Sequence, residues 1–170
     1  MSVILKLEKD GELVKRLRKP LDHAVYTIAV LKKTGNANIS SLRNRVICQK
    51  IVYFANRLGI TPQYDFSIYV KGPYSPELAN DLYALEPYFG EIREAEFVSE
   101  KTEKSFNRLQ SILAVDNMER ALEISSTLDF FRSVSESKEI AIRKTKEKKG
   151  ATEEEIEHAK KALKLLGLEG

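Results

Sequence analysis

A chain of 170 residues, 42% hydrophobic and 31% charged, is long enough for one domain with its own core. Its single cysteine, Cys48, excludes an internal disulfide, and no apolar run approaches the roughly 20 residues that a membrane helix needs. We therefore expect a cytoplasmic protein with no membrane partner, and the net charge of +3 is too small to indicate nucleic-acid binding by itself. The abundance of lysine and glutamate over glutamine favours a thermophilic source.

The first eighteen residues leave two alternatives open. Asp10-Gly11 could turn a hairpin between residues 3–8 and 12–17, because such a dipeptide suits a tight turn. Equally, residues 12–18 could form a short helix that ends before Pro20.

Two helices should follow, over residues 21–33 and 41–58. We expect Asp22 to cap the first and the Thr34-Gly35-Asn36 segment to end it. Ser40 or Ser41 should cap the second, whose apolar residues cover much of its circumference. A helix of that kind is usually central to the core.

Residues 66–70 alternate in hydrophobicity and are rich in aromatic and β-branched side chains, which predicts a strand. Gly72-Pro73 should end it, and Phe97-Val98 is the expected second strand. Ser75-Pro76 then has the cap and first-turn residues of a further helix, which Pro87 ends.

From Glu103 onward the chain reads as helical. Asp116 or Asn117 should cap one helix, and residues 138–148 form a basic one. Thr152 and Glu155 have the spacing of a capping box for the last helix. That helix is amphipathic, and it must bury its apolar face on its own domain, which we favour, or on a second copy in a homodimer.

The expected fold is mainly α, a multi-helix domain of about six helices with a small antiparallel β element. Residues 1–150 form the domain around a motif at 42–85, and residues 151–170 are the C-terminal helix of the same domain. Helices 21–33 and 41–58 followed by a strand and turn also fit a winged-helix-like arrangement. The expected core comprises Ile28, Val46, Ile47, Ile51, Phe54, Leu58, Phe66, Ile68, Leu78, Leu82, Leu109, Leu113, Ile124 and Leu128.

Nothing in the sequence indicates catalysis. His23, His158 and Cys48 lie on three separate segments without metal-ligand spacing. No glycine-rich phosphate loop is present, and neither histidine is placed by sequence to activate a nucleophile. We expect no metal, no cofactor and no enzymatic activity.

The corner formed by Tyr69, Lys71, Gly72, Pro73 and Tyr74 is the first candidate site. The structural interpretation is that glycine and proline shape a strand-to-helix turn, with Tyr74 packed on the second helix. The functional interpretation is a recognition corner for a peptide or a nucleic-acid backbone.

A second candidate is the set of basic residues Arg43, Arg45, Lys50 and Arg57. Three of them, Arg43, Lys50 and Arg57, are seven residues apart and share one helical face. Such a row could follow phosphates. The alternatives are a solvated face, or, for Lys50 and Arg57, a place on a core-like helix.

Part of the chain resembles a family. The residues that carry the resemblance are Gln49, Lys50, Ile51, Tyr53, Phe54, Tyr69, Gly72, Pro73 and Tyr74. They are similar to a pattern in YwgA-like uncharacterised proteins and the distantly related SocA/Panacea-type antitoxin domains, although the tryptophan common in the latter is absent. The resemblance implies a helical domain that binds and neutralises a toxin, and in one form presents it to a protease.

These observations lead to two hypotheses. The first is a non-catalytic protein-binding or regulatory module, antitoxin-like by resemblance, with a toxin-like partner. The alternative is a winged-helix-like regulator that binds nucleic acid.

Overall fold

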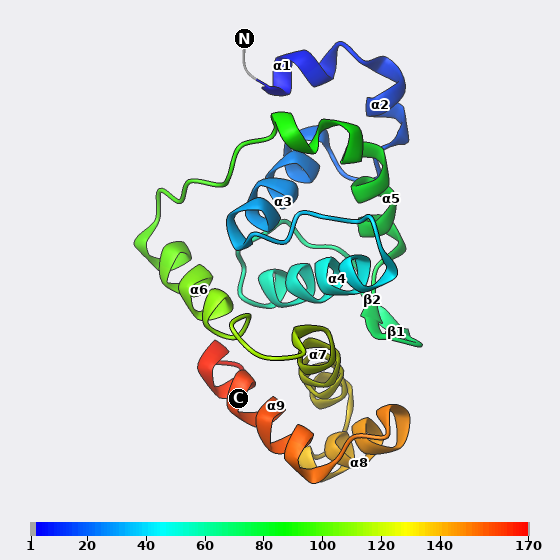
Figure 1. Cartoon of the computed structure of the whole chain (residues 1–170), viewed down its shortest axis with the longest axis vertical. Coiled ribbons are helices and arrows are strands. Elements are labelled where there is room, and N and C mark those ends of the chain that lie inside the picture. The colour runs from blue at the N-terminus through cyan, green and yellow to red at the C-terminus, as the bar shows by residue number, and fades with distance from the viewer. Residues whose placement is uncertain (1–2, 170) are drawn as a thin grey trace.

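The structure is a computed structural model and describes residues 3–169. This part of the chain contains nine α-helices, 68% helix in all, and one small two-stranded antiparallel sheet (Figure 1). The predicted class, mainly α with a small antiparallel β element, is confirmed, although the helices are more numerous than the six expected. The elements are α1 (Val3–Glu8), α2 (Gly11–Arg16), α3 (Leu21–Thr34), α4 (Leu42–Arg57), β1 (Ser67–Tyr69), β2 (Gly72–Tyr74), α5 (Pro76–Leu85), the 3-10 helix η1 (Glu86–Glu91), α6 (Glu100–Ser111), α7 (Met118–Val134), α8 (Lys138–Lys149) and α9 (Glu153–Leu166).

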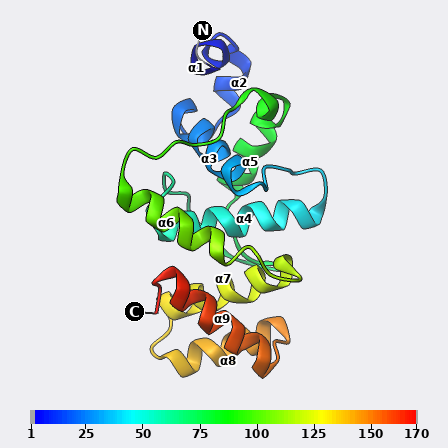
Figure 2. The same ribbon diagram turned by 60° about the vertical axis from the view of Figure 1, so that its left-hand side comes forward.

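The helices are stacked along the long axis of the molecule. The N-terminal helices α1 to α3 lie with α5 at one end, α4 crosses the middle, and α7 follows below it (Figure 1). Helices α8 and α9 lie beyond α7, at the opposite end from α1 and α2 (Figure 2). None of the described helices is long and apolar enough to cross a membrane.

Of the two alternatives for the N-terminal residues, the hairpin is wrong and the short helix is confirmed as α2. Asp10 accepts a hydrogen bond from the Leu13 backbone N–H at 3.0 Å, which commits the following residues to α2. Leu7 of α1 and Leu13 of α2 are both buried against the core. Two short helices therefore replace two strands.

The caps of the longer helices follow the sequence with two exceptions, at α3 and α7. Asn117 occupies the cap position of α7, but its side chain makes no capping hydrogen bond. Ser41 caps α4 through the Asn44 N–H, and the Thr152 capping box of α9 is present. Asp22 does not cap α3, because that helix has already begun at Leu21 and Pro20 occupies the cap position without a side-chain bond.

The β element differs from the expectation. Residues 97–98 form no strand, and β1 pairs instead with β2 in a hairpin that turns at Val70 and Lys71. Gly72-Pro73 does not end the β structure but belongs to its second strand. The positive φ of Gly72, 96°, allows the chain to reverse immediately after the turn.

Helix α4 is the centre of the core. All of residues 46–56 are buried, including the polar side chains among them. The other expected core residues are buried as well, except Leu58, Phe66 and Ile68, which are half-buried. Asp129 of α7 ties that helix to α4, because it accepts hydrogen bonds from Tyr53 at 2.6 Å and Arg57 at 2.7 Å.

Cys48 is a core residue, as expected. Its side chain is fully buried in α4, and its thiol donates to the Asn36 carbonyl at 3.1 Å. Burial raises the pKa of the thiol to about 11. The thiolate, which is the reactive form, is therefore disfavoured at neutral pH.

The last helix packs within the chain. Ile156, Ala159, Leu163 and Leu166 of α9 are buried, and α9 contacts α7 and α6. Glu155 completes the capping box and also pairs with Arg120 of α7 at 2.8 Å. The face that needed a partner is thus covered by its own domain.

This packing can be tested with two leucines that are two residues apart on α9. Leu163 is fully buried, so Leu163→Ala should lower the free energy of unfolding by about 2–5 kcal/mol. Leu165 is 56% exposed, so Leu165→Ala should change it by no more than about 0.5 kcal/mol. Urea denaturation measures both. Equal losses would contradict the orientation of α9.

Candidate functional site

The candidate site is a groove between α4, α5 and the β1–β2 hairpin. Its cavity has a volume of about 290 Å³. It brings together candidates from both sets that the sequence singled out: Arg45 and Lys50 from the basic set, and Tyr69, Lys71 and Tyr74 from the corner. The other lining residues are Ile39, Leu42, Val46, Gln49, Val70, Ala79, Leu82 and Tyr83.

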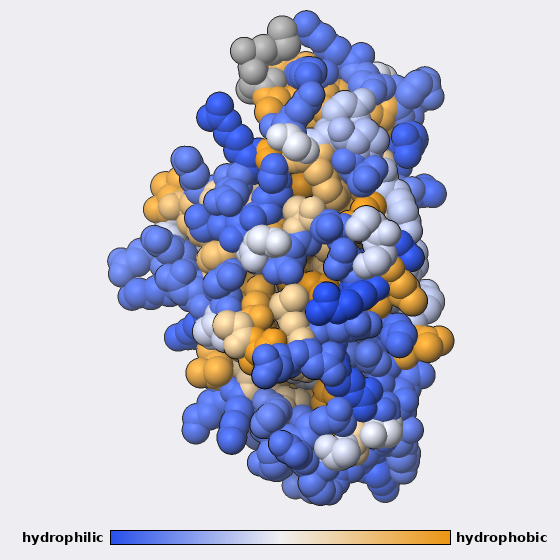
Figure 3. Space-filling model, viewed as in Figure 1, coloured by the Kyte–Doolittle hydropathy of each residue, from blue (hydrophilic) through white to orange (hydrophobic). Residues whose placement is uncertain are grey.

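The walls of the groove are mainly apolar, and part of that apolar surface is open. Leu42, Val70 and Tyr83 are 58%, 84% and 54% exposed. In Figure 3 a hydrophobic patch lies at the edge of the molecule where Figure 1 places the hairpin. A cluster of exposed apolar side chains around a hollow is typical of an interaction site rather than of ordinary surface.

The charge of the groove has one sign. Arg45 and Lys71 contribute basic side chains, and no acidic residue lines the groove. Arg45 donates to the Ile39 carbonyl at 3.2 Å, but within residues 3–169 neither Arg45 nor Lys71 forms an ion pair. The groove is therefore complementary to a ligand that is apolar and carries negative charge.

Gln49 fixes the start of α5 beside the groove. Its amide donates to the Ser75 carbonyl at 3.0 Å and accepts from the Ser75 N–H at 2.9 Å. Ser75 in turn caps α5 through the Leu78 N–H at 3.2 Å. One buried side chain thus satisfies both backbone groups of a residue that has no strand partner.

Lys50 of α4 fixes the inner strand of the hairpin, β2. Its side chain is only 1% exposed, and its amine donates to the Pro73 carbonyl at 2.6 Å. Burial lowers its pKa to about 7, an effect that the charge of Glu123 opposes and that of Lys149 adds to.

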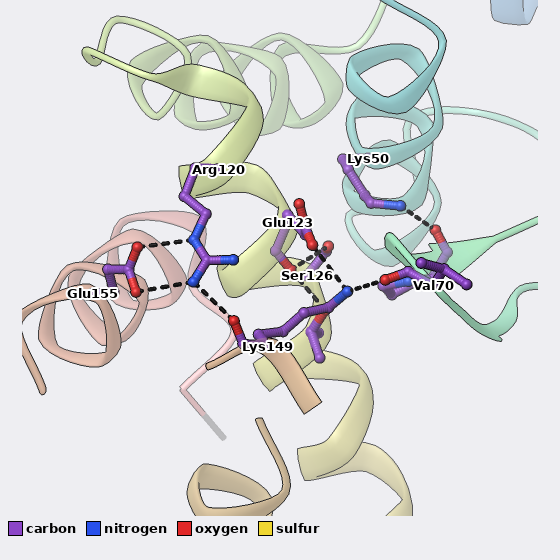
Figure 4. Close-up of polar contacts among 9 residues, drawn as sticks. Lys50, Val70, Arg120, Glu123, Ser126, Lys149 and Glu155 are labelled. Carbon is purple, nitrogen blue, oxygen red and sulfur yellow. Dashed lines mark hydrogen bonds and ion pairs between the residues drawn. The ribbon is translucent and has the colours of Figure 1, made fainter. Parts of the chain in front are cut away.

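A second buried lysine holds the turn of the hairpin. Lys149, at the end of α8, pairs with Glu123 of α7 at 2.9 Å and donates to the Val70 carbonyl (Figure 4). Val70 lies 79 residues away in the sequence. The groove wall is therefore attached to α8 as well as to α4.

Gly72 packs directly on α7. A Cβ at this position would lie 2.7 Å from the Thr127 hydroxyl oxygen and 3.4 Å from Cε of Lys50. Gly72 and Pro73 are both buried and do not line the groove. Of the five corner residues, these two shape the hairpin, while Tyr69, Lys71 and Tyr74 face the groove.

The two tyrosines of the hairpin support each other. The rings of Tyr69 and Tyr74 pack edge to face with centroids 5.1 Å apart. Tyr69 is 47% exposed, whereas Tyr74 is half-buried on a strand that contacts α4. An exposed tyrosine held by a second ring is a suitable anchor for a partner because little conformational entropy is lost on binding.

The expected basic row does not form an exposed surface. Lys50 is buried under the hairpin, Arg57 is bonded to Asp129, and Arg43 lies beside Glu119 at 3.7 Å. The winged-helix-like alternative would also require α4 to enter a nucleic-acid groove. Residues 46–56 are covered by the rest of the domain, so only the two ends of α4 are open to a partner.

Several residues of the site were not singled out by the sequence analysis. Leu42 and Val46 have the spacing of one helical face, so an apolar wall could have been found from them. Glu123 and Lys149 carried no such signal, because their relation to the hairpin depends on how α7 and α8 pack.

The described residues contain no group of three or more potential metal ligands. A larger hollow of about 540 Å³ lies between α7, α9 and the end of α6. It is lined by no residue of the corner or of the basic set, and both charge signs occur in it, including the Arg120–Glu155 pair.

Comparisons with protein-family models, curated proteins and solved structures find no match to this chain. The likeness of residues 42–85 to the YwgA-like and Panacea pattern remains a resemblance of motif. The geometry explains why some of those motif residues occur together: Gln49 and Lys50 bond to the backbone of Ser75 and Pro73.

The close packing of Gly72 against α7 leads to a first prediction for the site. Gly72→Ala should lower the free energy of unfolding by at least about 2 kcal/mol, since the φ of 96° and the contact with Thr127 both oppose a Cβ. Gly90 has open space around it, so Gly90→Ala is the matched control, with a change within about 0.5 kcal/mol. Chemical denaturation decides, and equal stability of the two variants would contradict the packing of the hairpin.

The buried amine leads to a second prediction. Above pH 7 folded Lys50 is neutral while the unfolded chain still binds a proton there, so this lysine makes the protein more stable as the pH rises towards 10.5. The variant Lys50→Met lacks this pH-dependent contribution to the free energy of unfolding. The stability of the unsubstituted protein relative to Lys50→Met should therefore increase by about 2 kcal/mol between pH 7 and 9.

Denaturation of both proteins at several pH values measures this difference. The range stops at pH 9 because burial raises the pKa of Tyr53 and Tyr64, which affects both proteins at higher pH. Parallel stability curves would show that Lys50 stays charged in the folded state.

Proposed function

We propose that this protein is a non-catalytic, cytoplasmic protein-binding module. Its groove takes a short segment of a partner protein that has an apolar side chain with acidic residues beside it. The observation that carries the proposal is the combination of open apolar walls, two basic side chains without ion pairs, and no carboxylate in the lining.

The size of the groove favours anchoring side chains over a cofactor. Its volume of about 290 Å³ is just below the usual range for ligand pockets, which is roughly 300–1,000 Å³. Protein interfaces typically concentrate their binding energy in a few aromatic and arginine residues around such a pocket. Tyr69, Tyr83 and Arg45 are residues of this kind at its edge.

A protein partner suits the groove better than a nucleic-acid backbone does. Leu42, Val46 and Leu82 offer nothing to a phosphate, and the buried position of Lys50 removes the middle of the basic row. The resemblance of the motif to antitoxin domains gives a separate reason to expect a protein, and it makes a toxin-like protein the first partner to consider.

The proposal can be tested without knowing the partner. A phage-displayed library of random peptides of about twelve residues should yield binders that combine large apolar residues with Asp or Glu. The best binder, labelled with a fluorophore, then serves as the probe for variants. A selection that enriches no peptide, or only basic ones, would contradict the proposal.

Leu42→Asp should weaken binding of this peptide at least about tenfold, because it places a charge in the apolar wall. An acidic residue suits the first turn of α4, so the fold should be kept. Val98→Asp is the matched control, since Val98 is fully exposed in a loop outside the groove. Fluorescence anisotropy gives both dissociation constants, and equal values would place the peptide elsewhere.

A further inference from the structure

The outer edge of β1 carries backbone groups that no other described residue pairs with. The sheet has two strands, and β2 is the one that contacts α4 and α7. The other edge of β1 therefore lies open at the side of the molecule, where Figure 1 shows the hairpin projecting from the helices.

The register shows which residue of β1 faces that edge. Ile68 lies opposite Pro73, which has no backbone N–H, and the Pro73 carbonyl points away from β1 to the Lys50 amine at 2.6 Å. Ile68 and Pro73 are therefore a pair that does not exchange hydrogen bonds. The N–H and C=O groups of Ile68 point away from β2, towards the open edge of the sheet. Ser67 and Tyr69 are the residues that bond to β2.

Apart from its short length of three residues, this edge lacks the features that usually prevent pairing with another strand. Proteins protect open edges with proline, inward-pointing charges, bulges or a covering helix. Ser67, Ile68 and Tyr69 include neither a charge nor a proline, and Ser67 and Tyr69 are exposed.

The edge is also held in place before any partner arrives. Lys50 bonds to Pro73 and Lys149 bonds to Val70, so the inner strand and the turn are fixed to α4, α7 and α8. Binding to a fixed edge costs less conformational entropy than binding to a mobile one.

We propose that an extended segment of the partner protein adds to β1 as a third strand and exchanges backbone hydrogen bonds with Ile68. This inference rests on the proposed function and gives the bound segment its conformation. In a strand, alternate side chains share one face, so every second side chain of the added strand lies on the face of Tyr69, at the mouth of the groove. The basic residues Arg45 and Lys71 then select acidic residues on that segment.

Hydrogen exchange tests the backbone contact directly in the unsubstituted protein. The Ile68 amide should exchange at least about tenfold more slowly when the selected acidic, apolar peptide is bound. The Val98 amide, in an exposed loop, is the control and should not change. If the peptide binds and the Ile68 amide exchanges as before, the added strand is overturned while the proposed function stands.

A pair of variants provides an independent test. Ile68→Pro removes the outward N–H without removing a bond to β2, since proline is tolerated where the N–H of an edge strand faces solvent. Ile68→Ala loses the same side chain but keeps the N–H. Peptide binding should fall at least about tenfold in Ile68→Pro relative to Ile68→Ala, and equal affinities would overturn the proposal.

A second copy of the chain is the competing occupant of the edge. Light scattering of the unsubstituted protein and of Ile68→Pro decides this point. A monomer in both cases agrees with a partner strand. If the unsubstituted protein is a dimer and Ile68→Pro is a monomer, the edge of β1 pairs with the same edge of a second copy. This result would overturn the assignment to a partner protein.

Discussion

The structure depends on two polar side chains that α4 places inside the core. The segment 73–75 runs past the most buried helix of the protein, and Pro73 and Ser75 are buried there. Gln49 and Lys50 form hydrogen bonds to the backbone of Ser75 and Pro73. A buried backbone group without a partner costs free energy comparable to a lost hydrogen bond, so these contacts decide where the chain can turn and where α5 begins.

From this point the contacts extend to both ends of the molecule. Ser75 starts α5, which packs on α3 in the N-terminal half. Gly72 rests on α7, and the turn of the hairpin is held by Lys149 of α8, whose charge is balanced by Glu123. The groove and the open edge of β1 are therefore produced by the same hairpin, and neither is an isolated surface loop.

The sequence predicted what is governed by local rules. The starts of α4, α5 and α9 follow from Ser41, Ser75 and Thr152, because a cap acts within three residues. The partner of β1 was missed because Gly72-Pro73 normally ends a strand. Here the positive φ of Gly72, and a proline at a position that donates no hydrogen bond to β1, fit the second strand of a hairpin. The turn makes Tyr69, Lys71 and Tyr74 candidates from the sequence, and all three line the groove. For Lys50 the sequence leaves a phosphate-binding row and a core-like helix both open, since periodicity shows a shared face but not what covers it. Only tertiary packing brings Lys149 to the site.

Because Cys48 is buried, the rate at which a reagent labels its thiol reports how often the structure around α4 opens. Cys48 carries the one thiol of the sequence, and this thiol lies in the most buried helix with its pKa raised to about 11. The rate of labelling is then limited by the rare states in which α4 separates from its neighbours. A partner that clamps the hairpin onto α4 makes those states rarer, so its binding would register as slower labelling of a residue that it never touches.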